Sequence, residues 1–250
     1  MCDGRRPAGV RGGSLSDVIT IGFLHTSPVH VPTFRELLAD ADPGARDVHV
    51  VDEQLLADAR ARGVDAGVEA RVLERLRELG GHRPDVVVCT CSTVSGHAEQ
   101  LAGQARLPVL RIDRPMAEEA VAGGGRVAVV AAVASTLGPT RQLLEECAAA
   151  AGTGAEIVEA PCLDAWAAFE AGDQAGYLER IARHVREVAG RADVVVLAQA
   201  SMAAVADLVR DLDTPVLSSP RPAVVRAVDL ARATRRGPGA PRPGDRAGTS

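Results

Sequence analysis

The sequence predicts an α/β fold of two similar lobes, which arose by internal duplication and have a small-molecule cleft between them. Three observations support this prediction: two continuous valine runs, an alternation of strand-like with helix-like segments, and short motifs that recur at nearly one offset. Valine runs without polar alternation are typical of parallel strands that are covered on both faces. We therefore expect each lobe to hold a parallel sheet flanked by helices.

The duplication is visible in three pairs of segments, which are separated by 107 or 108 residues. They are DVVVCTCST at 85–93 with DVVVLAQAS at 193–201, PVL at 108–110 with PVL at 215–217, and PT with a following leucine at 32–37 and again at 139–144. Valine and alanine are common, so a single match carries little weight. Three matches in the same order at nearly one offset indicate a repeated unit.

Each copy is predicted to begin with a short apolar strand, which a polar loop and a helix follow. In the first copy we expect strands over 19–24, 47–51, 85–88 and 108–112, and helices over 32–39, 68–79 and 93–104. In the second copy we expect strands over 126–131, 155–160, 193–197 and 215–217, and helices over 139–150, 175–189 and 202–212. Strands that alternate with helices imply right-handed crossovers and a doubly wound sheet in each copy.

The two ends of the chain are predicted to be disordered. Residues 1–17 are rich in glycine and arginine, residues 233–250 are rich in proline, glycine and arginine, and both offer almost nothing to bury. The first stretch lacks the apolar segment of a secretory signal, so we expect a cytoplasmic protein. The five cysteines, an odd number without a framework spacing, agree with free thiols in a reducing compartment.

Composition and motifs argue against several classes of function. The net charge of −5 and the aromatic content of 2% disfavour nucleic-acid binding. No apolar run approaches roughly 18 residues, so no membrane span is expected. The chain has no lysine, which excludes Schiff-base chemistry and lysine-bound pyridoxal phosphate. No P-loop, no dinucleotide motif after a strand and no cysteine–histidine cluster occurs, so we expect neither a cofactor nor a metal.

Small polar residues follow four of the predicted strands, at the strand ends where open α/β sheets bind ligands. They are His25, Thr26 and Ser27; Cys91, Ser92 and Thr93; Ser135 and Thr136; and Gln199 and Ser201. Hydroxyls and the N–H groups of helix N-termini attract anions. We therefore expect the cleft to bind a small carboxylic acid rather than a nucleotide. For Ser135, Thr136 and Ser201 a role as helix caps is the alternative.

Cys91 is the sharpest candidate for chemistry. It follows a buried strand and opens a helix, where the helix dipole is expected to lower the thiol pKa and favour a reactive thiolate. Its repeat mate is the polar Gln199, which indicates a position facing the cleft, whereas Cys89 matches Leu197 and is expected to be a core residue. The alternatives for Cys91 are an inert buried thiol and a Cys-x-Cys metal pair, which no further ligand completes.

His25 ends the first predicted strand. Its ordinary pKa lies near neutral pH, so it is a candidate general acid/base or a partner for a carboxylate. A core or capping histidine is the alternative.

These segments resemble the aspartate/glutamate/hydantoin racemase superfamily, in which two α/β lobes each place one cysteine against the substrate. The resemblance spans about residues 19–230. It rests on IGFLHTSP at 21–28, VVVCTCST at 86–93, STLGPT at 135–140, VLAQASM at 196–202 and PVLSSP at 215–220. It implies a first lobe of 18–113 plus 216–232 and a second lobe of 114–215.

The resemblance also implies roles for particular residues. Cys91 corresponds to the first catalytic cysteine, with Ser92 and Thr93 as donors to the substrate carboxylate. His25 falls where some members carry an acidic residue that assists this cysteine. Gln199 replaces the second catalytic cysteine, which leaves a two-base racemisation one thiol short. A glutamine at this position can instead hydrogen-bond a carboxylate or an enolate oxygen.

We therefore expect a cofactor-independent isomerase of the amino-acid racemase class, in which Cys91 moves a proton at the carbon next to a carboxylate. His25 or water would replace the second thiol. Two alternatives stay open: a single-cysteine decarboxylase of arylmalonate type or an enzyme similar to maleate isomerase, and a non-catalytic protein that binds small carboxylates. The expected partner is a small carboxylic or amino acid, and a homo-oligomer is left open.

Overall fold

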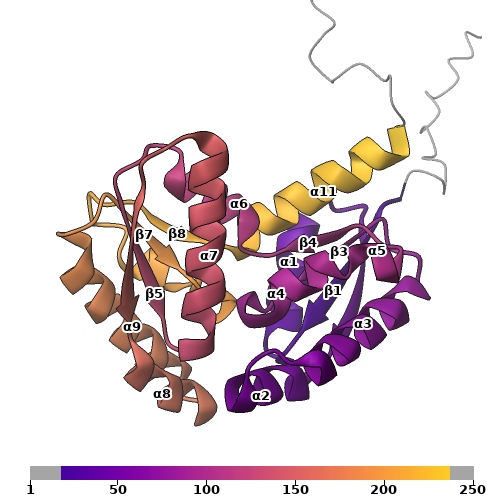
Figure 1. Cartoon of the computed structure of the whole chain (residues 1–250), viewed down its shortest axis with the longest axis horizontal. Helices are drawn as coiled ribbons and strands as arrows, with labels where there is room; N and C mark the ends of the chain where they lie inside the picture. The colour runs from indigo at the N-terminus through magenta and orange to yellow at the C-terminus, as the bar shows by residue number, and fades with distance from the viewer. Residues whose placement is uncertain (1–17, 237–250) are drawn as a thin grey trace, which may run out of the picture.

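The computed structural model describes residues 18–236, which form two α/β lobes side by side (Figure 1). Residues 1–17 and 237–250, for which the sequence predicts disorder, lie outside the described residues. The last helix, α11 (Pro220–Arg236), includes residues 233–236, which the composition had placed in the tail. Within the part of the chain that the structure describes, no helix is both long and apolar enough to cross a bilayer.

Each lobe is built on a sheet of four parallel strands in the same spatial order. The first sheet runs β2 (Arg46–Val51), β1 (Thr20–His25), β3 (Val86–Cys89) and β4 (Val109–Arg111). The second sheet runs β6 (Glu156–Pro161), β5 (Arg126–Ala131), β7 (Val194–Leu197) and β8 (Val216–Ser218). The matching order confirms the prediction of two similar parallel sheets.

Helices flank both sheets. The first lobe holds α1 (His30–Ala41), α2 (Glu53–Arg62), α3 (Ala66–Gly80), α4 (Ser92–Gln100) and α5 (Ala102–Ala105). The second holds α6 (Arg114–Val121), α7 (Ala134–Ala151), α8 (Trp166–Glu170), α9 (Gln174–Ala189) and α10 (Val205–Leu208), with single turns η2 (Leu163–Ala165) and η3 (Ala200–Met202).

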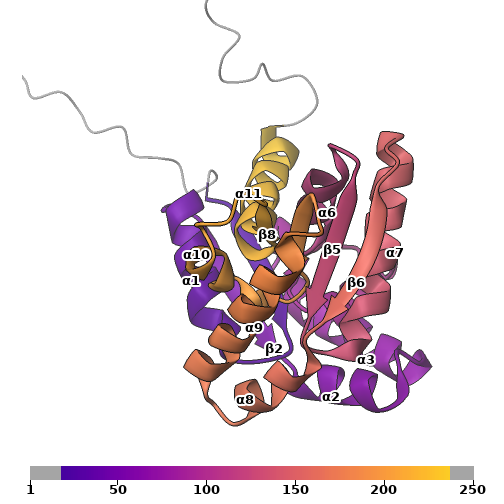
Figure 2. The same ribbon diagram turned by 90° about the vertical axis from the view of Figure 1, so that its left-hand side faces the viewer.

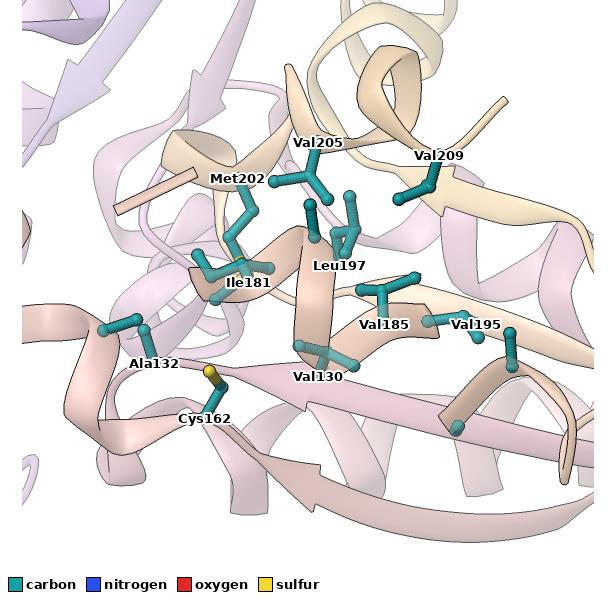
Figure 3. Close-up of a cluster of buried hydrophobic side chains, with 14 of the residues drawn as sticks. Val130, Ala132, Cys162, Ile181, Val185, Val195, Leu197, Met202, Val205 and Val209 are labelled. Atoms are coloured by element: carbon teal, nitrogen blue, oxygen red, sulfur yellow. The ribbon is translucent and has the colours of Figure 1, made fainter. Parts of the chain in front are cut away.

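The valine strands are buried because helices cover both of their faces. All four residues of β3 and of β7 are buried. In the second lobe α9 lies on one face of the sheet and α7 on the other (Figure 2). Figure 3 shows the first of these faces, where Ile181 and Val185 of α9 share a core with Val195 and Leu197 of β7. The continuous apolar runs therefore report burial on two sides, as expected for parallel sheets.

The duplicated aspartate before each valine run has the same task in both lobes. Asp85 accepts a hydrogen bond from the backbone N–H of Thr20 at 2.7 Å. Asp193 accepts one from the backbone N–H of Arg126, also at 2.7 Å. Each carboxylate thus holds the start of the neighbouring central strand, which explains why the repeat includes it.

The lobe boundary lies later than the expected residue 216. Strand β8 pairs with β7, so residues 216–218 belong to the second sheet. The chain returns to the first lobe after Ser219, where Ala223 and Ala227 of α11 share a core with Ile21. The edge strand stays with its own copy of the repeat because its backbone finds hydrogen-bond partners there.

Several helices differ from the predicted ranges. The segment 93–104 divides at Leu101 into α4 and α5, and 202–212 holds only α10 and the last residue of η3. Helix α7 begins at Ala134, so that Pro139 lies inside it rather than at its start. Helices α2, α6, α8 and α11 were not predicted. Half of the α2 residues are polar and α8 is only five residues long, so neither of these two helices carries a strong apolar period.

Candidate active site

A cavity of about 600 Å³ lies between the lobes at the carboxyl ends of the strands. The loops after β1, β3, β5 and β7 line it, together with α2 from the first lobe and α8 from the second. Cys91 and Gln199, the repeat mates, both line this one cavity. The duplication therefore brings these two positions to a shared space.

Cys91 sits immediately before α4 and has only 9% of its surface exposed. The Thr26 hydroxyl and the backbone N–H groups of Thr93 and Val94 lie within hydrogen-bonding reach of its sulfur and lower the thiol pKa. Burial outweighs them, so that the pKa of Cys91 is raised above its ordinary value. The prediction that this pKa is lowered is wrong. Burial destabilises the thiolate more than the hydrogen bonds at the start of the helix stabilise it.

Cys89 faces away from the cavity and is fully buried, as its match with Leu197 predicts. Burial raises the pKa of its thiol strongly. Among residues 18–236 no group of three or more histidine, cysteine or acidic side chains could hold a metal ion.

Ser92 and Thr93 supply hydroxyls beside the thiol. The Ser92 side chain lines the cavity, and its buried hydroxyl has no hydrogen-bond partner. The Thr93 hydroxyl lies 3.3 Å from that of Thr136 and 3.4 Å from that of Ser135, which links the first lobe to the start of α7. Thr136 lines the cavity, whereas Ser135 does not and touches it only through Thr93.

Gln199 is held by the backbone of its own lobe. Its Oε1 atom accepts hydrogen bonds from the N–H groups of Ala132 at 2.6 Å and Val133 at 3.1 Å. These two amides follow β5, at the place where Thr26 and Ser27 follow β1 and line the cavity. The Gln199 side chain therefore occupies these two backbone donors.

His25 does not line the cavity, contrary to the expectation that it meets the ligand. Side chains two residues apart on a strand point to the same face of the sheet, so His25 lies on the same face as Phe23. The two rings are stacked on each other. Its ring nitrogens lie 2.8 Å from the Thr90 hydroxyl and 2.9 Å from Nδ1 of His49. In turn, Nε2 of His49 lies 2.8 Å from a carboxylate oxygen of Asp47.

This chain of side chains constrains the chemistry open to His25. Burial, followed by the neighbouring His49 and His30, lowers the pKa of His25 to about 3. The ring is therefore neutral at physiological pH, and its contacts toward the cavity are with the lining residues Thr90 and His30. Direct general acid/base action on a ligand is not available to it in this position.

Ser201 lines the cavity, and its hydroxyl lies 2.7 Å from the phenol oxygen of Tyr177. The cap role considered for this serine is therefore replaced by a side-chain contact inside the second lobe.

One side of the cavity, formed by α2 and α8, was not predicted from the sequence. Leu56 and Arg60 of α2 face Trp166, Phe169 and Glu170 of α8 across the mouth. The available signal was the pair Trp166 and Phe169, two aromatics three residues apart in a chain with only three Phe, one Tyr and one Trp.

Comparison with known proteins agrees with this arrangement. The Asp/Glu/Hydantoin racemase family matches residues 25–227. The chain belongs to this family. The resemblance stated from the sequence is thus confirmed over nearly all of the described residues. No curated protein matches the chain by sequence.

Solved structures of this racemase family and its neighbours share the fold. Aspartate racemase of Picrophilus torridus is 13% identical with a TM-score of 0.66, over 85% of this chain and 94% of that one. Allantoin racemase from Klebsiella pneumoniae is 22% identical with a TM-score of 0.55, over 85% and 87%. Unliganded arylmalonate decarboxylase is 20% identical with a TM-score of 0.54, over 91% and 96%. At these identities the similarity establishes the fold.

Proposed function

We propose that this member of the racemase family is a cofactor-independent enzyme in which Cys91 transfers a proton at the carbon next to the carboxylate of a small acid. The observation that carries the proposal is the juxtaposition of one thiol with the partnerless hydroxyl of Ser92 in a cavity between the lobes. Free thiols at all four described cysteines are consistent with a cytoplasmic protein.

The geometry supports a simple division of tasks. The hydroxyls of Ser92, Thr93 and Thr136 would hold the substrate carboxylate and stabilise the negative charge that spreads onto it as the α-proton leaves. The Cys91 thiolate would accept that proton, forming an S–H bond as the C–H bond breaks, and would return it or exchange it with solvent. Because burial raises the Cys91 pKa, the thiolate fraction and the exchange rate should increase as the pH rises above neutral.

The opposite face of the substrate would meet Gln199, which is neither an acid nor a base. We therefore expect isotope exchange with retention to be faster than inversion, which needs a proton from water. The raised pKa of Cys91 also favours a second candidate, because a thiol that is protonated at rest suits one-sided protonation of a carbanion left by loss of carbon dioxide. Neither route needs a step through His25.

Deuterium oxide separates these reactions. Candidate 2-substituted acids and malonic acids are incubated with the full chain, and the α-proton, chirality and carbon dioxide are followed. Exchange supports the first reaction and carbon dioxide release supports the second. Cys147→Ser is a matched control because Cys147 is also buried but lies in the second lobe outside the cavity. Binding without either reaction, or full activity in Cys91→Ser, would contradict the proposal.

A further inference from the structure

We infer that this cavity accepts carboxylic acids with an apolar substituent, above all an aryl group, in preference to acids whose side chain ends in a second carboxylate. The inference rests on the proposed function for the placement of the first carboxylate beside Cys91. It is carried by three features of the cavity: an aromatic wall, a neutralised cation and an occupied pair of amides.

The aromatic wall lies on the side of the cavity formed by α8. The rings of Trp166 and Phe169 are stacked with their centroids 4.6 Å apart, and both side chains line the cavity. Leu56 of α2 contributes an apolar side chain from the other lobe. In a chain with an aromatic content of 2%, this pair is the main aromatic surface that the cavity offers to a ligand. Aromatic side chains are favourable contacts for apolar groups and for other rings.

The basic side chains near this wall offer no free positive charge. Among the described residues, Arg60 and His30 are the basic side chains in the cavity lining. Nη1 of Arg60 lies 2.6 Å from a carboxylate oxygen of Glu170, and its guanidinium lies 5.3 Å from the Trp166 ring centroid. The indole N–H of Trp166 donates to the same carboxylate at 2.7 Å. Burial lowers the pKa of His30 to about 4, so its ring is neutral.

The remaining donors of the second lobe are also engaged. Gln199 accepts from the backbone N–H groups of Ala132 and Val133, which would otherwise form a second anion site. A side-chain carboxylate would therefore lose its hydration without gaining a free cation or a free pair of amides. An apolar group loses no such hydration, and the volume of about 600 Å³ leaves room for a ring beyond the first carboxylate.

Calorimetry on the full chain tests this with phenylacetate and glutarate as probes. We expect phenylacetate to bind at least about tenfold more tightly than glutarate. Trp166→Ala and Phe169→Ala should each reduce phenylacetate affinity about tenfold and leave glutarate affinity unchanged. Leu163→Ala is the control, because Leu163 is exposed, adjacent to α8 and outside the lining. Trp166→Phe, which keeps a ring, should retain most of the preference if Trp166→Ala proves poorly folded.

A charge-release variant makes the test sharper. Glu170→Gln leaves Arg60 without its carboxylate partner and should increase glutarate affinity about fivefold while phenylacetate affinity stays constant. Equal or tighter glutarate binding by the wild type, no measurable binding of either acid, or a preference that survives Trp166→Ala and Phe169→Ala would overturn the inference.

Deuterium exchange in the same samples reports on the proposed function separately. A phenylacetate preference without exchange supports the inference and contradicts the Cys91 chemistry. Exchange on glutarate but not on phenylacetate supports the chemistry and overturns the inference.

Discussion

The two halves of the cavity have the same backbone frame but different side chains. In the first lobe the second residue after β3 is the thiol Cys91, which precedes Ser92, whose hydroxyl has no hydrogen-bond partner. In the second lobe the second residue after β7 is Gln199. Its amide oxygen accepts hydrogen bonds from two backbone N–H groups of the same lobe. The duplication therefore kept two equivalent positions at the cavity, of which one holds a thiol and the other an amide.

The contrast extends below the cavity. His25 ends β1 and contacts Thr90 and His49, whereas the matching last residue of β5 is Ala131. A buried polar chain that runs to Asp47 therefore belongs to the first lobe alone within the described residues. Within the cavity lining, the thiol belongs to the first copy and the two stacked aromatic rings belong to the second.

The largest expected difference between the two halves is in the exchange rates of variants at Cys91 and Gln199. Cys91→Ser should reduce α-proton exchange by about a thousandfold, because a hydroxyl is a far weaker acid and base than a thiol. Gln199→Ala should keep at least about a tenth of the activity, because Gln199 transfers no proton. Nuclear magnetic resonance in deuterium oxide measures both rates. Comparable losses in the two variants would mean that the halves are functionally equivalent.

The buried histidine predicts an acid sensitivity that originates in the first lobe. The folded pKa of His25 is about 3 against an ordinary 6.5, so between these values the unfolded chain binds a proton that the folded chain does not. The free energy of unfolding should therefore decrease as the pH falls through this window, by on the order of 4 kcal/mol from His25.

Urea unfolding at a series of pH values measures this loss. The pKa of His30 is also lowered, so some of the slope between neutral pH and about 4 belongs to that residue. His25→Gln should flatten the slope relative to the wild type. An unchanged slope in His25→Gln would assign the acid sensitivity elsewhere.

A smaller effect, on stability, is expected from the side-chain amide of Gln199. Gln199→Ala leaves the N–H groups of Ala132 and Val133 without their protein acceptor, which should cost about 1–2 kcal/mol of folding free energy. Gln199→Glu retains an oxygen acceptor and should restore most of the stability. Thermal unfolding of both variants checks this, and equal melting temperatures for Gln199→Ala and the wild type would show that the contact contributes nothing.

The smallest expected stability effect lies in the first half. The Ser92 hydroxyl has no protein partner, so Ser92→Ala should change folding free energy by less than about 0.5 kcal/mol. The same variant should weaken phenylacetate binding about tenfold, because a hydrogen bond to a charged carboxylate is lost. Calorimetry and thermal unfolding together distinguish a ligand-binding hydroxyl from a structural one. A stability loss without an affinity loss would move Ser92 out of the site.

Much of the fold was predictable because its signals are local. The valine runs at β3 and β7 mark buried parallel strands, and the repeat offset pairs residue 91 with residue 199 at one cavity. Helix α8 escaped prediction because five residues are too few to show a helical period. The position of His25 outside the cavity lining could not be predicted, because the sequence does not show which way the side chain of a strand's last residue points.

The sequence by itself determined the duplication, the parallel sheet in each lobe and the choice of Cys91 as the candidate for chemistry. Each of these follows from side-chain periodicity and repetition along the chain, which need no knowledge of distant contacts. Only the tertiary structure decided the direction of the Cys91 pKa shift, the engagement of Gln199 and the meeting of α2 with α8. Desolvation and hydrogen-bond partners depend on which atoms surround a group in space, and residues far apart in the chain supply most of those atoms.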